Sequence, residues 1–204
     1  MNRDIIKTFN VMSISMLCSF IGTIFLGNIL SIEDFGFFNT VKTFLPMASL
    51  LILMGIDKSF IKNFSNQKEE SIVFFLLISF ALLSALISFM IELIFSLNNF
   101  LIIFITIFLG ALNLFSAAYY RLNNSYMLAQ FSQSGNKIVF LSIVFTLYYF
   151  NFEYNNIIVY FFLIPLFIPG LVFFKYIYDT YNKRLKKINF YDYISLYKYG
   201  FLFF

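Results

Sequence analysis

The sequence predicts an all-α membrane protein, a bundle of six transmembrane helices that form one lobe, followed by the start of a seventh. Of its 204 residues, 61% are hydrophobic and only 12% are charged, and the mean hydropathy is +0.85. A soluble domain has about a quarter of its residues charged, so this chain lacks the charge to cover a water-facing surface. The apolar residues form long runs without the ten-residue alternation typical of a membrane barrel.

Six apolar runs lie near residues 9–30, 37–56, 71–95, 100–120, 131–150 and 157–178. Each is close to the length of about 20 residues that a helix needs to cross a membrane. Residues 1–178 are therefore predicted to form the six-helix lobe. A further apolar run, residues 196–204, predicts the start of a truncated seventh span.

Residues 179–195 connect the lobe to that last run and are rich in basic and aromatic side chains. They predict a cytoplasmic amphipathic linker that lies on the membrane and is attracted to anionic lipids. A solvated loop that follows the positive-inside rule is an equally good interpretation of the same segment.

The fifth run requires a helix longer than its purely apolar part. At 1.5 Å per residue, the stretch from Ile138 to Phe150 covers about 20 Å of a hydrocarbon core that is about 30 Å thick. The helix must therefore begin earlier, which brings Gln133, Asn136 and Lys137 toward the membrane interior.

Prolines lie inside two of the predicted spans: Pro46 in the second, and Pro165 and Pro169 in the sixth. A proline inside a helix removes a hydrogen bond, so we expect these helices to kink or break. Prolines are also ordinary in membrane helices, so they do not by themselves indicate transport.

The basic residues predict the orientation in the membrane. Every Lys and Arg except Lys42 lies near the N-terminus or in or just beyond the connections that follow the second, fourth and sixth spans. The alternate connections, residues 31–36, 96–99 and 151–156, contain none. The positive-inside rule therefore places the N-terminus in the cytoplasm. The net charge of +4 is thus an indication of topology, and we expect no nucleic-acid partner.

The inventory of reactive side chains does not favour an enzyme. The chain has no His and a single Cys, Cys18, so neither a disulfide nor the usual zinc site can form within it. Glu33 and Asp34 are neighbours in a predicted outer loop and would not converge on a substrate as an acid and base pair. We expect no catalytic activity, metal or cofactor.

Lys42 is the exception to the one-sided distribution of basic residues, five residues into the second run and so about 8 Å below the outer surface. A charge inside the membrane costs a few kcal/mol on insertion scales. Lys42 therefore either faces a cavity, where it would contact an anionic ligand, or extends its long side chain to the outer headgroups. Both interpretations remain open from the sequence.

Other polar residues at similar depth extend this candidate site. Asn39 lies one turn before Lys42, and Asn113 lies in the middle of the fourth span, where an amide often forms hydrogen bonds across helices. Glu92 is near the outer end of the third span. It could pair with Lys42 or carry a proton, although an interfacial carboxylate in contact with water is the favoured interpretation. The predicted substrate-binding residues are Lys42, Asn39, Asn113 and Lys137.

Four short motifs follow one another along the chain. The connection after the first span contains an acidic pair followed by Phe-Gly, formed by Glu33, Asp34, Phe35 and Gly36. Gly55 and Asp57 come next, with Lys62 five positions after the aspartate. Arg121 closes the fourth span, and Gly200 ends the segment that leads into the last run.

In order and spacing, these motifs resemble the N-terminal half of bacterial polysaccharide biosynthesis flippases of the multidrug/oligosaccharidyl-lipid/polysaccharide exporter superfamily. The resemblance implies two six-helix lobes around a cavity and transport by alternating access across the bacterial cytoplasmic membrane. The implied cargo is an undecaprenyl-diphosphate-linked oligosaccharide for O-antigen or capsule synthesis. The implied partners are this lipid-linked oligosaccharide, membrane lipids, and a polysaccharide polymerase with its chain-length machinery.

Under this hypothesis, Lys42 would contact the anionic diphosphate at the outer end of the path and Lys137 at the inner end. Two alternatives remain. One is a multidrug exporter of the same superfamily, which would need acidic residues for cationic drugs, and only Glu92 is available. The other is a non-transporting fragment or partner module of a glycan assembly complex, which the short final run favours.

Overall fold

The computed structural model describes residues 2–64, 70–95, 100–150, 158–181, 194 and 196–200. Within these residues each element is an α-helix, which confirms the predicted all-α class for the described part of the chain. Six long helices correspond to the six apolar runs, and a short helix, α3, lies between the second and the third. The elements are α1 (Asn2–Ile29), α2 (Ile32–Leu53), α3 (Ile56–Phe64), α4 (Glu70–Phe95), α5 (Phe100–Leu122), α6 (Tyr126–Phe150) and α7 (Ile158–Tyr181).

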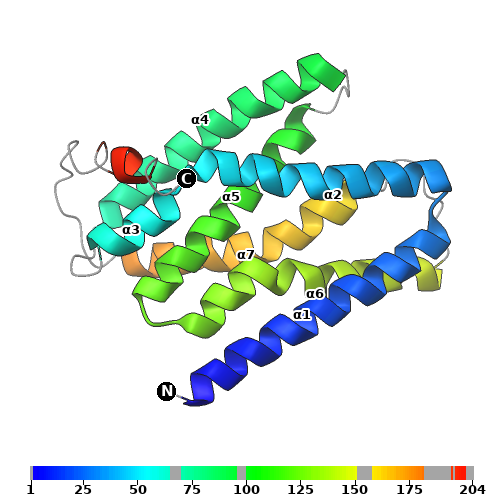
Figure 1. Cartoon of the computed structure of the whole chain (residues 1–204), viewed down its shortest axis with the longest axis horizontal. Coiled ribbons are helices and arrows are strands. Elements are labelled where there is room, and N and C mark those ends of the chain that lie inside the picture. Colours follow the sequence, from blue (N-terminus) through cyan, green and yellow to red (C-terminus); the bar gives the residue numbers. More distant parts are fainter. Residues whose placement is uncertain are drawn as a thin grey trace.

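The long helices alternate in direction along the bundle. Helices α1, α4 and α6 run one way, and α2, α5 and α7 run the other (Figure 1). The end at which α1 begins and α5 finishes also carries α3, so Lys7, Lys58, Lys62 and Arg121 gather at that end. This arrangement agrees with the charge asymmetry in the sequence, while the cytoplasmic position of the N-terminus stays a prediction.

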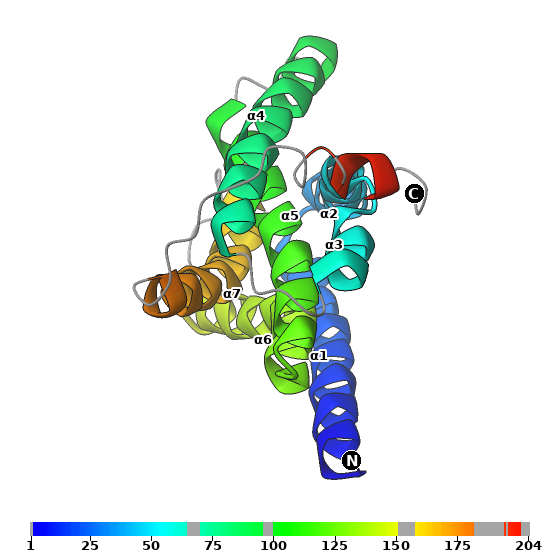
Figure 2. The same ribbon diagram turned by 90° about the vertical axis from the view of Figure 1, so that its left-hand side faces the viewer.

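Helix α5 occupies the centre of the bundle. It packs against α2, α3, α4, α6 and α7, and half of its most apolar window is buried, against 17–28% for α1, α2 and α4. Helix α1 packs mainly along α6 and touches α2 much less. Figure 2 shows α1 and α4 extending to opposite sides of α5. The centre of the bundle is therefore built around α5, and α1 and α4 form its margins.

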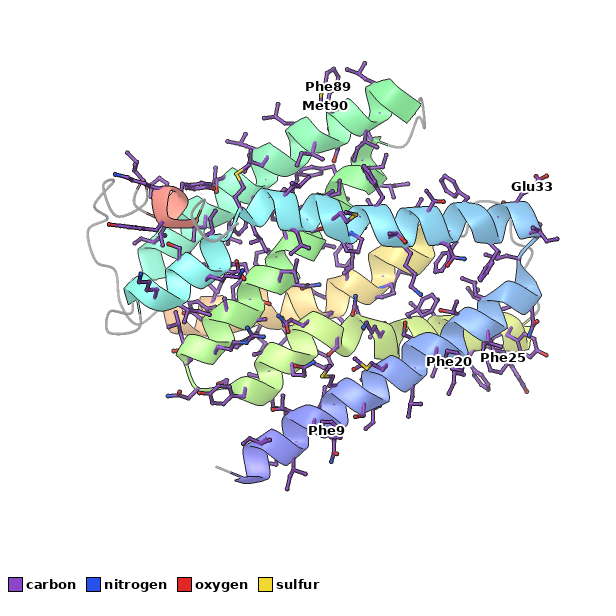
Figure 3. The ribbon with its side chains drawn as sticks, viewed as in Figure 1. Phe9, Phe20, Phe25, Glu33, Phe89 and Met90 are labelled. Carbon is purple, nitrogen blue, oxygen red and sulfur yellow. The ribbon has the colours of Figure 1, made fainter. Side chains whose placement is uncertain are left out.

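Within the described residues, four helical segments are long and apolar enough to cross a membrane, and they cover Ile5–Ile29, Ile32–Leu53, Phe75–Leu93 and Phe100–Leu122. Large apolar side chains point outward from them, as Figure 3 shows for residues such as Phe9 and Phe20, each 67% exposed. An apolar perimeter of this extent indicates a membrane protein.

The last two long helices, α6 and α7, are not among these four. Helix α6 carries several polar residues in its first half, and α7 contributes the shorter apolar stretch Ile164–Lys175. The number of six membrane crossings therefore stays a prediction.

Helix α2 begins at Ile32, earlier than the predicted start at residue 37. Its N-cap is Ser31, whose Oγ accepts a hydrogen bond from the backbone N–H of Asp34 at 3.1 Å and donates to the Asp34 carboxylate at 2.7 Å. Glu33 and Asp34 occupy the first turn, where the helix dipole favours negative charge. The prediction that this acidic pair lies in a loop was wrong, because the cap extends the helix through it.

The end of α2 also differs from the prediction. Met54 and Gly55 both have positive φ, 42° and 73°, and terminate the helix at Leu53. The chain then forms α3, which buries Ile56 and Phe60 on one face. Apolar residues four positions apart, Ile56 and Phe60, alternate here with the exposed Lys58 and Lys62. This amphipathic pattern would have predicted the helix.

The other long helices test two further predictions. Helix α6 begins at Tyr126, which confirms that this helix must start well before Ile138. Helices α2 and α7 both continue through their prolines, so neither helix breaks there, and the predicted kinks stay a prediction. In α7, the carbonyl of Leu166 accepts a hydrogen bond from Asn113 of α5, and such neighbouring groups help membrane helices to tolerate proline.

The described C-terminal residues, 196–200, form a short helical segment that packs against α4 and the turn between α2 and α3. Leu196 is buried, and the Tyr197 hydroxyl donates to Ser79 Oγ of α4 at 2.5 Å. Gly200 lies on the turn between α2 and α3, where an added Cβ would be 2.9 Å from the carbonyl oxygen of Met54. Most of the predicted linker 179–195 and residues 201–204 of the predicted seventh span lie outside the described residues.

We expect Gly200→Ala to destabilise the protein by about 1–3 kcal/mol, because the new methyl group would collide with backbone that cannot rotate away. For a chain of this size, this corresponds to a fall in Tm of several degrees in a detergent melting experiment. Gly36→Ala is the matched control, since nothing lies within 4 Å of a Cβ at that position. Equal melting temperatures for the two variants would contradict the close packing at Gly200.

Candidate functional site

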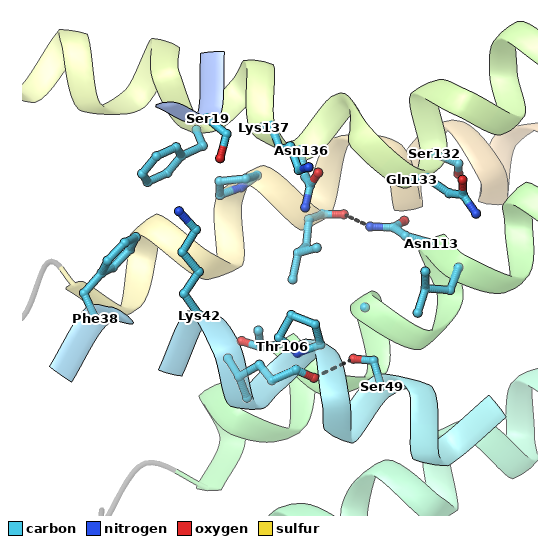
Figure 4. A pocket seen from close by; sticks show the side chains of 17 residues that line it. Ser19, Phe38, Lys42, Ser49, Thr106, Asn113, Ser132, Gln133, Asn136 and Lys137 are labelled. Carbon is cyan, nitrogen blue, oxygen red and sulfur yellow. Dashed lines mark hydrogen bonds between the residues drawn. The ribbon is translucent and has the colours of Figure 1, made fainter. Parts of the chain in front are cut away.

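A cavity of about 350 Å³ lies between α1, α2, α5, α6 and α7 (Figure 4). Three of the four predicted substrate-binding residues line it: Lys42 from α2, Asn113 from α5 and Lys137 from α6. Asn39 is half-buried on α2 and is not among the lining residues. The fold thus brings together polar groups that are far apart in the sequence.

The Lys42 ammonium is turned into the bundle. Its Nζ donates a hydrogen bond to Thr23 Oγ1 of α1 at 3.0 Å and lies 5.6 Å from the ring centroids of both Phe38 and Phe140. These two rings are stacked 5.8 Å apart, so the cation faces an aromatic pair that attracts it electrostatically. Of the two interpretations left open by the sequence, the structure shows the cavity-facing one.

Lys42 is also deeper than its position in the apolar run suggested. Because α2 begins at Ile32, the helix rises by about 12 Å between Asp34 and Lys42. Thr23 in turn precedes the end of α1 at Ile29 by about 9 Å of helix. An ammonium at this depth needs polar surroundings, which the hydroxyl, the rings and the cavity provide.

Lys137 lines the same cavity as Lys42. The two lysines therefore belong to one site, and their roles at the outer and inner ends of a path stay a prediction. Helix α6 begins early, at Tyr126, which places Lys137 about 16 Å along that helix. The described residues that line the cavity include no carboxylate, so the cavity carries two positive charges and suits an anion.

Glu92 does not take part in this arrangement. It is half-buried on α4 and does not line the cavity. Helix α4 extends from α5 on the side opposite α1 (Figure 2), and within the described part of the chain Glu92 forms no ion pair with Lys42. The hypothesis of a Lys42–Glu92 pair was wrong, because α5 lies between the cavity and most of α4.

Uncharged polar groups form the other part of the lining. Asn113 is only 4% exposed, and its Nδ2 donates to the carbonyl of Leu166 at 3.1 Å, which confirms the predicted hydrogen bond across helices. Among the described residues, its Oδ1 has no hydrogen-bond partner, and neither has Oδ1 of Asn136. Both residues line the cavity, together with Ser132 and Gln133.

The aromatic pair was missed by the sequence prediction. Phe38 lies one turn before Lys42, and Phe140 lies three residues after Lys137, so each ring shares a helix face with a lysine. This spacing is the signal that could have identified them. It is diluted because the chain contains 32 Phe residues, most of which serve apolar packing.

The residues of the family motifs lie outside the cavity lining. Phe35 stacks on Phe38 with centroids 6.4 Å apart and so supports the aromatic pair from behind. Arg121 donates to Gln133 Oε1 at 3.1 Å and thereby holds a residue that does line the cavity. The remaining motif residues form helix ends and turns, namely Glu33, Asp34, Gly36, Gly55, Asp57, Lys62 and Gly200.

No protein-family model matches the chain, and no curated protein or solved structure matches it. The chemistry of the site is therefore argued from its geometry. Two ammonium groups, an aromatic pair and a set of amide and hydroxyl groups enclose a small space between apolar helices. Such a space suits a ligand that is anionic at one end and polar but uncharged at the other.

We expect Lys42→Met to raise the free energy of unfolding by about 1 kcal/mol, because it removes a charge from the membrane interior and relieves repulsion from Lys137. Thr23 is not left without a partner, since its hydroxyl also donates to the carbonyl of Ser19 at 2.7 Å. The exposed Lys198→Met is the matched control and should melt like the parent chain. A clear loss of stability in Lys42→Met would show that Lys42 has a structural role.

Proposed function

We propose that this chain is a lobe of a flippase that moves undecaprenyl-diphosphate-linked oligosaccharide across the bacterial cytoplasmic membrane for O-antigen or capsule synthesis. The observation that carries the proposal is the pair of lysines, Lys42 and Lys137, in one cavity whose described lining has no carboxylate. The order of the sequence motifs favours the same function.

A diphosphate matches this pair of lysines. Ammonium–phosphate hydrogen bonds are charge-assisted and are among the stronger ones in proteins. They strengthen further where water is scarce, because the effective dielectric constant is low. The negative charge of a diphosphate would also offset the electrostatic repulsion between Lys42 and Lys137. This repulsion lowers the stability of the lobe without ligand, so its relief would favour binding.

The size of the cavity limits which part of the substrate it can hold. A volume of about 350 Å³ suits the diphosphate and the sugar next to it, but is too small for a whole oligosaccharide. The polyprenyl tail would stay in the bilayer beside the apolar helices. In the two-lobe arrangement implied by the resemblance, the rest of the glycan would lie between the lobes.

Transport would follow the alternating-access scheme, with one lobe rocking against the other. The proposed topology has six crossings and a cytoplasmic N-terminus, so the substrate would enter from the side that carries the basic helix ends. The central α5 and its bonded neighbours would move as one body, because their contacts are internal to the lobe.

The structure disfavours the multidrug alternative. A transporter of cationic drugs needs negative charge in its binding site, whereas the described lining here contains two lysines and no acidic residue. A purely structural partner module, in turn, would have no use for two half-buried cations that line one cavity. Glycan export and drug susceptibility, measured together, distinguish these two functions from the proposed one.

In a bacterial strain whose surface glycan depends on this protein, we expect the double variant Lys42→Gln and Lys137→Gln to lose most glycan export, by tenfold or more. Both ammonium partners of the diphosphate would be missing, while size and polarity are kept. The measurement is surface glycan by lectin or antibody binding, with accumulation of the lipid-linked precursor as the second readout.

The matched control is Lys198→Gln, which removes an exposed lysine far from the cavity and should export normally. Protein levels in the membrane are compared for all variants. Normal export by the double variant would contradict the proposal. Unchanged export together with altered drug susceptibility would favour the multidrug exporter instead.

A further inference from the structure

The cavity has a second chemical feature beside its two lysines. Two amide oxygens, Asn113 Oδ1 and Asn136 Oδ1, are buried there without a hydrogen-bond partner among the described residues. A buried acceptor that makes no hydrogen bond is costly, and native proteins rarely leave such groups unpaired. Two in one cavity point to hydrogen-bond donors that arrive with a ligand.

The orientation of the Asn113 amide follows from its surroundings. The carbonyl of Leu166 can only accept, so the group 3.1 Å from it must be the NH₂ of Asn113. The opposite side of the amide is therefore its oxygen, as Figure 4 shows. Asn113 cannot satisfy this acceptor by flipping, because the oxygen would then face the Leu166 carbonyl.

A glycine of α7, Gly170, packs next to this oxygen. A Cβ built on Gly170 would lie 3.8 Å from Asn113 Oδ1, so even a small side chain there would be in contact with the amide. Asn136 lies one residue before Lys137 on α6 and so links the amide groups to the cationic part of the lining. The uncharged acceptors and the ammonium groups thus belong to one continuous cavity.

We infer that these two amides form a separate subsite that accepts hydrogen bonds from the hydroxyl or amide N–H groups of the sugar attached to the diphosphate. This inference rests on the proposed function and adds a division of roles. Lys42 and Lys137 bind the diphosphate, whatever it carries. Asn113 and Asn136 distinguish a glycosylated diphosphate from a bare one, because only the former brings donors.

The test measures the binding of two probes to the purified full chain in phosphatidylcholine nanodiscs. One probe is farnesyl diphosphate, and the other is the same molecule with one N-acetylhexosamine on its diphosphate. We expect the parent chain to bind the glycosylated probe about tenfold more tightly, since buried acceptors that gain donors favour binding.

Asn136→Leu is the cleaner variant, since the described residues provide no hydrogen bond that it would break. It should weaken binding of the glycosylated probe by about tenfold and leave binding of farnesyl diphosphate within twofold. Asn113→Leu should do the same, with a melting experiment to check its fold because it also loses the bond to Leu166. Asn39→Leu, outside the lining, is the matched control.

The outcomes separate this inference from the proposed function. If Lys42→Gln weakens binding of both probes but neither amide variant changes their ratio, the amides bind water only and the inference alone is overturned. If the parent chain binds neither probe, both proposals are overturned. If phosphatidylglycerol added to the nanodisc competes as well as the glycosylated probe, the subsite takes general lipid headgroups and the inference is also overturned.

Discussion

Three hydrogen bonds between α5 and its neighbours α2, α6 and α7 hold the centre of the described structure together. The Ser49 hydroxyl of α2 donates to the carbonyl of Ile107, Asn113 donates to Leu166 of α7, and Ser116 shares a short hydrogen bond with Ser132 of α6. Helices in lipid gain little from apolar contact with one another, so such bonds and close packing of small residues position them. Gly110 contributes the close packing, because a Cβ there would collide with Ser49.

These bonds also explain why a cavity is present. They fix α2, α6 and α7 around one side of α5, while α1 is held chiefly by α6. The direct polar link from α2 to α1 is the hydrogen bond of Lys42 to Thr23, beside the stacked rings of Phe38 and Phe140. The cavity in this arrangement is lined by Lys42 and Lys137 and by Asn113 and Asn136, whose amide oxygens have no partner among the described residues.

The sequence predicted the long helices well because, in lipid, an apolar run must satisfy its backbone within a helix. The prediction failed at the helix boundaries, which depend on local hydrogen bonds. The Ser31 cap starts α2 earlier than the apolar run indicated, and the short amphipathic α3 was predicted as part of a loop. Lys42, Asn113 and Lys137 could be found because polar groups at depth are rare. Their meeting in one cavity could not, since it depends on how each helix is rotated and packed.

The central claim is that Lys42 and Lys137 together hold a diphosphate inside the lobe. The most direct test is a ¹⁵N–³¹P dipolar recoupling measurement by solid-state NMR on lysine-labelled protein in bilayers of a phosphorus-free glycolipid, with farnesyl diphosphate as the source of phosphorus. The account predicts that two lysine ammonium signals are dephased by phosphorus, and that each disappears in the corresponding glutamine variant. Dephasing that persists in the double variant, or that involves no ammonium group, would contradict it.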